Sequence, residues 1–374
     1  FRDGLVQFEI GVQSTNPDTI QAIHRKMDLD RLKENVAMVH QKRNIHQHLD
    51  LIAGLPYEDL QSFHRSFNDV YAMQPDQLQL GFLKVLKGSP MHRMAKEYGI
   101  QYHSKPPYEV LSTTWLPYED VRTLKGIEEV VERYYNSLQF ESSLRYLVEQ
   151  EQDAFAFFEK LALFFTQNGY FNVKQSRMQN YEILYAFAKK EQRNVDIVKE
   201  LLIYDLYARE NVKKEPDFLE NRMLTEEKKE KLRAFYQSEA QREKYLPDYP
   251  DYNWKQVMRM THMEWFSYDI VQYLQDGILH EKKTLVLFDY QKRNPLSYQA
   301  KVQIVREPNK EIRPKGFILK RYREYIFYKG VFMAKRMTVR EKERVARILT
   351  LLDKEYGTDY RCYLEHDSAW QLLI

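Results

Sequence analysis

Three polar side chains in the first fifty residues have the chemistry to hold a small ligand. They are the amide of Gln13, the guanidinium of Arg25 and the carboxylate of Asp50. An amide and a carboxylate suit the hydroxyl groups of a ribose, and a guanidinium can hold a carboxylate through two hydrogen bonds. Polar residues occur at the ends of strands in every α/β protein. The alternative is therefore that these three residues have a structural role only.

The elements around these residues predict that their side chains meet. Strands are predicted at 5–14, 46–53 and 77–86, and helical segments separate them. This alternation is typical of a parallel sheet or a (β/α) barrel. The carboxyl ends of parallel strands share one edge of the sheet, where such folds bind their ligands. We therefore expect Gln13, Arg25 and Asp50 at that edge.

The pattern changes near Ser104–Pro107, and we predict domains at 1–104, 105–283 and 284–374. The middle domain is predicted to be an aromatic-packed helical bundle, without a strand anywhere in 118–280. Its helices are expected at 118–139, 152–168, 178–191, 194–209, 225–242 and 262–276. The last domain is predicted to be a small α+β unit. Its strands are expected at 284–290 and 298–305, with a hairpin-like pair at 317–332, and a helix starts at the capping box of Thr338 and Glu341.

Charge is unevenly distributed, although the net charge of the whole chain is only +3. Residues 291–347 contain 17 Lys and Arg against 5 Asp and Glu, interleaved with aromatic residues. Cations for phosphates and rings for base stacking predict single-stranded RNA as a partner of this segment. The alternative is a sheet whose solvent face is basic.

Other chemistry has weaker signals. His46 and His48 lie on one face of a predicted strand, but a zinc site needs further convergent ligands, and surface histidines are the alternative. No phosphate-binding loop, dinucleotide fingerprint or serine-hydrolase elbow occurs. The single cysteine, Cys362, excludes a disulfide scaffold. With no signal-peptide pattern and no apolar run of membrane-spanning length, we predict a cytoplasmic protein without membrane contact.

Several stretches resemble the fourth and fifth strand regions of radical SAM enzymes. They read Gly11-Val12-Gln13-Ser14, Ile23-His24-Arg25 and Leu49-Asp50-Leu51-Ile52-Ala53-Gly54-Leu55-Pro56. The likeness is greatest to the branch that contains oxygen-independent coproporphyrinogen oxidase and its cobalamin-binding relatives. Residues 78–88 resemble the sixth strand of one group of these proteins, which joins a cobalamin-binding domain, a radical SAM barrel and a C-terminal domain of unknown function.

The resemblance implies a fold and a site. Residues 1–104 would be the C-terminal half of a radical SAM-type (β/α) barrel. Gln13 and Asp50 would hold the ribose of S-adenosylmethionine (SAM), and Arg25 its carboxylate. Backbone near Ile52, and from Phe82 to Lys84, would flank the adenine. The intact protein would cleave SAM reductively and modify an unreactive carbon.

The sequence departs from this family in one respect that matters for activity. It has no Cys-x-x-x-Cys-x-x-Cys loop, which holds the family's [4Fe–4S] cluster, and no cobalamin-binding domain. Phe1 is not an initiating methionine, and a strand follows almost at once. We therefore expect the missing N-terminal half of the same protein as a partner, the cluster and cobalamin in the intact protein only, and no activity in this chain alone. A non-catalytic RNA-binding or scaffold module is the alternative.

Overall fold

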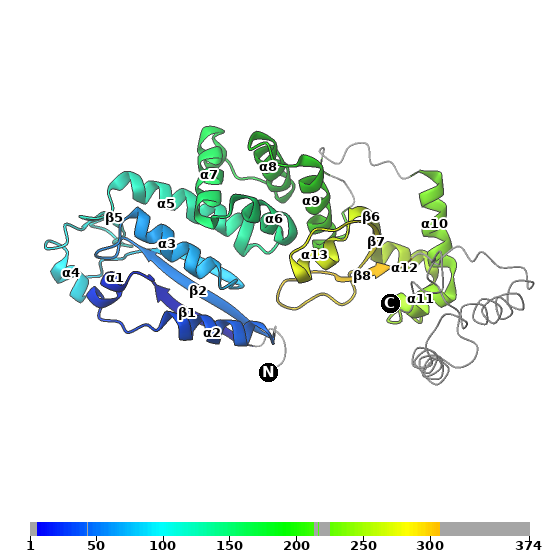
Figure 1. Ribbon diagram of the computed structural model, residues 1–374, viewed down its shortest axis with the longest axis horizontal. Coiled ribbons are helices and arrows are strands. Elements are labelled where there is room, and N and C mark those ends of the chain that lie inside the picture. Colours follow the sequence, from blue (N-terminus) through cyan, green and yellow to red (C-terminus); the bar gives the residue numbers. More distant parts are fainter. Residues whose placement is uncertain (1–5, 43, 213–215, 217–224, 307–374) are drawn as a thin grey trace, which may run out of the picture. The chain divides into compact units, whose positions relative to one another are not determined.

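The computed structural model describes residues 6–42, 44–212, 216 and 225–306 (Figure 1). The chain divides into two compact units, Phe1–Glu307 and Pro308–Ile374. All of the described residues lie in the first of these units. The strands predicted at 317–332, the helix after Thr338, Cys362 and most of the basic segment lie outside the described residues.

The unit begins with a three-stranded parallel sheet. Its strands, in the order β1-β2-β3, are β1 (Val6–Gln13), β2 (Ile45–Ala53) and β3 (Gln77–Phe82). The connecting helices are α1 (Pro17–Ala22), α2 (Leu29–His40) and α3 (Leu60–Tyr71). The prediction of adjacent parallel strands separated by helices is confirmed.

The central strand, β2, pairs with both of its neighbours and buries alternate side chains. Gln47, Leu49, Leu51 and Ala53 are buried on one face, in the core that also contains residues of α2 and α3. An ion pair between Lys33 and Asp69, 3.7 Å apart, joins these two helices. The other face of the sheet carries the polar side chains of the alternate positions, Asp50 among them.

A short hairpin extends the sheet region beyond β3. The helix α4 (Pro90–Met94) precedes the two strands β4 (Gln101–Tyr102) and β5 (Val110–Ser112), which are antiparallel. The Val110 N–H donates to the Leu83 carbonyl, 2.9 Å away, and Lys84 forms an isolated bridge with Glu109. The third strand therefore ends at Phe82 rather than at the predicted residue 86, and residues 83–85 pair with the hairpin.

The helical bundle follows. Its elements are α5 (Tyr118–Val131), continued by a π-helix (Glu132–Asn136), α6 (Glu141–Glu151), α7 (Ala154–Gln167), α8 (Arg177–Lys190) and α9 (Val195–Arg209). Buried aromatic rings such as Phe158 and Tyr181 fill its core, as the composition predicts. The helix α6 was not predicted from its sequence. Its N-terminus is capped from a distance by Asp205, which accepts from the N–H groups of Ser142 and Ser143 at 2.9 Å.

The last part of the unit combines short helices with an antiparallel sheet. The elements are α10 (Glu226–Gln237), α11 (Glu239–Tyr245), α12 (Trp254–Met260), β6 (Thr261–Tyr268), α13 (Ile270–Asp276), β7 (Glu281–Asp289) and β8 (Lys301–Val305), with the sheet order β6-β7-β8. The predicted helix at 262–276 is wrong in its first half and confirmed only at 270–276, as α13. The prediction that 118–280 contains no strand is wrong. Residues 261–268 instead pair with β7, which buries Met263 and Phe266.

One hydrophobic cluster runs through most of this unit. It includes Val12 of the parallel sheet, Phe158 of the bundle and Phe288 of β7. The division at residues 104 and 283 stays a prediction. None of the helices in the described ranges is long and apolar enough to cross a membrane.

Candidate functional site

Gln13 and Arg25 meet over Gly11 near the carboxyl end of β1. Arg25 donates from Nη1 to the Gly11 carbonyl over 2.6 Å. A Cβ at Gly11 would lie 2.5 Å from Gln13 Nε2 and 3.5 Å from Arg25 Nη1. The amide and the guanidinium therefore occupy the space that a side chain at position 11 would fill. Gln13 has a φ of +71°, which is unusual for a residue other than glycine.

Asp50 is the partner of Gly11 in the register of β1 and β2. Paired residues of parallel strands direct their side chains to the same face, so Asp50 shares the face over which Gln13 and Arg25 lie. Its Oδ1 is 3.0 Å from Nε2 of His48, and about a third of its side chain is exposed. Burial raises the pKa of the Asp50 carboxyl, His48 lowers it, and Glu9 raises it again.

The three residues thus supply complementary groups on one face of the sheet. The carboxylate accepts hydrogen bonds, the guanidinium donates them, and the amide does both. This set can bind a ligand that carries hydroxyl groups at one end and a carboxylate at the other. Among the described residues, no group of three or more His, Cys, Asp and Glu side chains could hold a metal ion.

The residues predicted beside the adenine are arranged differently from one another. Ile52 is partly buried and pairs with Gly81, on the face of Asp50. The Phe82 ring is buried, with Lys125 Nζ 4.0 Å from its centre. Lys84 is exposed, and its carbonyl accepts from Leu86 N–H. The N–H of Leu83, between them, donates to Ala53, so part of this backbone is already engaged.

A buried polar cluster beside Gln13 was not predicted from the sequence. The Glu58 carboxylate accepts from Ser14 Oγ at 2.7 Å and from Ser66 Oγ at 3.0 Å. Glu58 is only 1% exposed, and burial raises its pKa to about 7 although both hydroxyl bonds lower it. The sequence signal available was Ser14 itself, which directly follows a candidate ligand residue. Glu58 itself lies just before α3, and no local pattern links it to Ser14.

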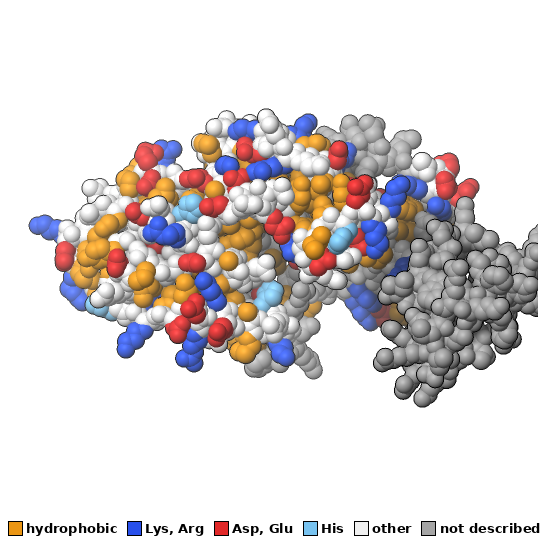
Figure 2. Space-filling model, viewed as in Figure 1, with side chains coloured by type: hydrophobic (Ala, Val, Ile, Leu, Met, Phe, Trp, Pro, Cys, Tyr) orange, Lys and Arg blue, Asp and Glu red, His pale blue; other side chains and the backbone are white. Residues whose placement is uncertain are grey.

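Aromatic side chains border the same edge of the sheet. Tyr57, 46% exposed, lies with its ring centre 4.5 Å from that of Trp115, and Tyr98 is 5.8 Å from Trp115. Figure 2 shows hydrophobic side chains at the end of the view where α4 and β5 lie in Figure 1. At these separations the rings contact one another, so they leave no space between them for a ligand.

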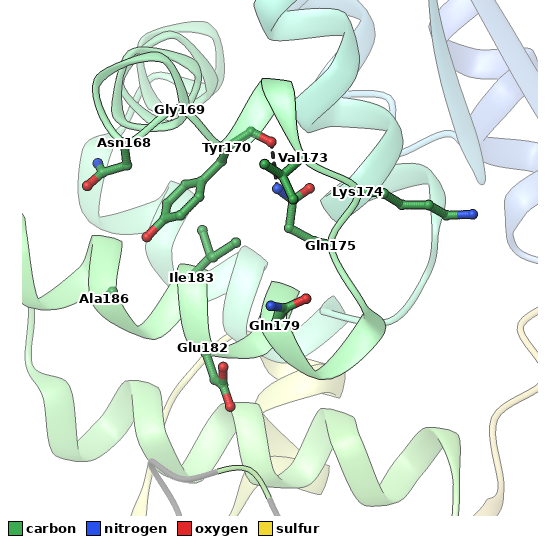
Figure 3. Close-up of a pocket in the computed structure, with 10 residues that line it drawn as sticks. All are labelled: Asn168, Gly169, Tyr170, Val173, Lys174, Gln175, Gln179, Glu182, Ile183 and Ala186. Atoms are coloured by element: carbon green, nitrogen blue, oxygen red, sulfur yellow. Dashed lines mark hydrogen bonds between the residues drawn. The ribbon is translucent and has the colours of Figure 1, made fainter.

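A separate pocket of about 480 Å³ lies in the bundle between α7 and α8 (Figure 3). Its polar lining is largely engaged already. Gln175 donates to the Tyr170 carbonyl at 2.5 Å, and Gln179 forms the capping box of α8 with Ser176. Lys174 and Glu182 also line it. No buried polar atom points to a particular ligand there.

Together, these features define a mixed α/β protein whose parallel sheet carries a polar site at its carboxyl edge. The chain belongs to the family described as "Protein of unknown function (DUF4080)", whose family model matches residues 96–288. That match covers the hairpin, the bundle and part of the antiparallel sheet, and begins after the candidate site.

A solved structure is similar to part of the chain. It is coproporphyrinogen III oxidase (HemN) from Escherichia coli, described as a radical SAM enzyme. The identity is 18%, the similarity covers 33% of this chain and 33% of that enzyme, and the TM-score is 0.22. A TM-score this low does not show a shared fold. A search of curated proteins found no match.

Proposed function

We propose that this chain carries the SAM-binding residues of a radical SAM enzyme, with Gln13 and Asp50 at the ribose and Arg25 at the carboxylate. The observation that supports this proposal is that these three side chains, from positions 13, 25 and 50, lie on one face of the parallel sheet around Gly11. Their chemistry matches the two ends of SAM: hydroxyl groups for the amide and Asp50, and a carboxylate for the guanidinium.

When bound next to a reduced iron–sulfur cluster, SAM supplies the radical chemistry of this enzyme class. The residues described here do not fit the cluster itself, which is held by cysteine thiolates. The only cysteine of the chain, Cys362, lies outside the described residues. We propose that the cluster, and cobalamin with it, bind to another part of the intact protein.

Binding of SAM to the full chain tests this proposal. Calorimetry should show that Asp50→Ala weakens SAM binding roughly tenfold or more, because a charged hydrogen-bond acceptor is lost. Asp30→Ala, on the exposed first turn of α2, is the control and should bind as the wild type does. If the wild-type chain binds no SAM, or if Asp50→Ala has no effect, the proposal is wrong.

A second ligand separates the role of Arg25 from that of Asp50. 5′-Methylthioadenosine keeps the adenine and ribose of SAM but lacks its carboxylate. Arg25→Ala should weaken the binding of SAM and leave that of 5′-methylthioadenosine unchanged, whereas Asp50→Ala should weaken both. Equal losses for both ligands in Arg25→Ala would contradict the assignment of the guanidinium to the carboxylate.

The basic segment at 291–347 supports a second proposal, that the chain contacts single-stranded RNA there. Its support is the local excess of Lys and Arg among aromatic residues. This role is compatible with the first, since it uses a different part of the chain.

A further inference from the structure

The loop between β1 and α1 is fixed by side chains from outside it. Ser14 Oγ donates to Glu58 Oε1, and Thr15 N–H donates to Ser66 Oγ at 3.0 Å. Ser66 Oγ in turn donates to the same oxygen of Glu58. The Glu58 carboxylate therefore accepts hydrogen bonds from one hydroxyl group in the loop, that of Ser14, and from one on α3, that of Ser66. We call Ser14, Thr15, Glu58 and Ser66 the loop clamp.

Further hydrogen bonds hold Thr15 and Asn16 of the same loop. Thr15 Oγ1 donates to Asp69 Oδ2 at 2.8 Å, and Asn16 Nδ2 donates to the Tyr57 carbonyl at 2.8 Å. The Asn16 side chain also caps α1, where it accepts from Asp18 N–H. The three loop residues after Gln13 are each tied to α3 or to the segment just before it.

This matters for Gln13 because its backbone is strained. A φ of +71° in a residue with a side chain costs free energy, and such a conformation persists only when its surroundings hold it. The residue that follows, Ser14, is completely buried and bonded to Glu58. The clamp therefore sets the direction of the chain at the point where Gln13 turns its amide over Gly11.

We infer that Glu58 is a positioning residue, which acts through the loop clamp to hold the Gln13 amide in its ligand-binding orientation. The inference rests on the proposed function, since it assigns Gln13 to the ligand. Glu58 itself does not reach the ligand, because its side chain is buried beneath the loop. The charged groups that act on it are Asp59, which follows it in the chain, and Arg65 of α3.

Within the described part of the chain, the buried Glu58 Oε2 has no hydrogen-bond partner. A buried acceptor without a donor is costly, so a carboxylate is retained here at the expense of stability. A glutamine, which has the same shape, keeps the carbonyl oxygen that accepts from the two serines. Glu58→Gln should therefore preserve the clamp, while Glu58→Ala removes it.

The alanine variant of Ser66 tests the clamp on the full chain, with Ser62→Ala as a matched control. Both serines are buried on α3, but Ser62 Oγ donates within its own helix turn, to the Asp59 carbonyl, and makes no bond to the loop among the residues that the structure describes. Hydrogen exchange of the Thr15 amide should accelerate in Ser66→Ala and stay unchanged in Ser62→Ala, because only the first variant removes its acceptor. Equal exchange in the two variants would overturn the clamp.

SAM affinity then tests the role of the clamp. Ser66→Ala and Glu58→Ala should each bind SAM roughly tenfold more weakly, whereas Glu58→Gln should stay close to the wild type. In a Gln13→Ala background, Ser66→Ala should have no further effect, since the group it positions is gone. Additive losses in this double-mutant cycle would show general destabilisation and overturn the inference.

The two proposals fail in distinguishable ways. If SAM affinity depends on Asp50 but does not change in Ser66→Ala and Glu58→Ala, the positioning role is wrong and the proposed function stands. If the wild-type chain binds no SAM at all, the proposed function and the ligand-positioning role both fail. The exchange of the Thr15 amide then still decides whether Glu58 and Ser66 hold the loop.

Discussion

At Gly11, the absence of a side chain allows two polar groups to approach each other above the sheet. Gly11→Ala would place a methyl group 2.5 Å from the Gln13 amide nitrogen, which is the far end of a flexible side chain. The amide should move aside, and the free energy of unfolding should change by less than about 1 kcal/mol. SAM binding should weaken in calorimetry. Gly126→Ala, on α5 in the helical bundle, where the nearest atom is 3.4 Å away, is the control.

Glu58 should make stability depend on pH in a window that can be calculated. Its folded pKa of about 7 lies above its usual value of 4.5, so the folded protein binds the proton more tightly. The stabilisation is complete below pH 4.5 and is lost as the pH rises to 7, a change of about 3 kcal/mol. Glu58→Gln lacks this titration. Urea unfolding from pH 4.5 to 8 should show the wild type losing stability relative to the variant, and parallel curves would contradict the shift.

At the scale of elements, one carboxylate joins the parallel sheet region to the bundle. Asp153 caps α7, where it accepts from Ala156 N–H at 2.9 Å. It also contacts two side chains of α3, His64 at 2.7 Å and Asn68 at 3.0 Å. Burial alone would raise the pKa of Asp153, but these hydrogen bonds lower it below its usual value. The cap is therefore also a contact between helices.

Asp153→Ala should reduce the free energy of unfolding by about 2 kcal/mol, because a helix cap and two bonds to α3 are lost together. The comparison is Asn194→Ala, which removes the cap of α9. Its loss should be nearer 1 kcal/mol, the usual value for one cap. Chemical denaturation of both variants measures the difference. Equal losses would mean that the contacts from α3 contribute nothing.

The prediction of secondary structure failed where neighbouring strands decided the outcome. Residues 262–276 were predicted as a helix, yet Thr261–Tyr268 forms β6 because it pairs with β7 along most of its length. Only the end of the segment is helical, as α13. In α6, the missing signal was the capping residue, since Asp205 lies more than sixty positions away along the chain. Local patterns do not contain such partners.

At the scale of the whole chain, the charge distribution predicts where RNA would bind. If the segment at 291–347 binds single-stranded RNA, affinity should fall steeply with salt, because each neutralised phosphate releases a counterion. Fluorescence anisotropy with the full chain at two salt concentrations measures this. Replacing Lys320, Arg321 and Arg323 by glutamine should reduce both affinity and salt dependence. The same replacement of Lys189, Lys190 and Arg193, in the helical bundle, is the control.

The sequence alone determined the parallel sheet and the residues proposed at its edge. Alternating apolar positions in β2, the capping residues Asn16 and Asp59, and the positions of Gln13 and Asp50 in their strands are all local properties. A strand buries the side chains of one face, and the first N–H groups of a helix need hydrogen-bond acceptors. Both requirements can be recognised in the residues of the element itself. Those requirements were sufficient to predict adjacent parallel strands separated by helices.

Only the tertiary structure decided how the side chains meet. Ser14 and Glu58 are 44 positions apart, and their 2.7 Å contact exists because the loop after β1 lies against α3 and the segment that leads into it. The left-handed backbone of Gln13 likewise depends on what surrounds it rather than on its own preference. A hydrogen bond requires its atoms to be placed within a few tenths of an ångström. That placement comes from the packing of three elements, which no local pattern encodes.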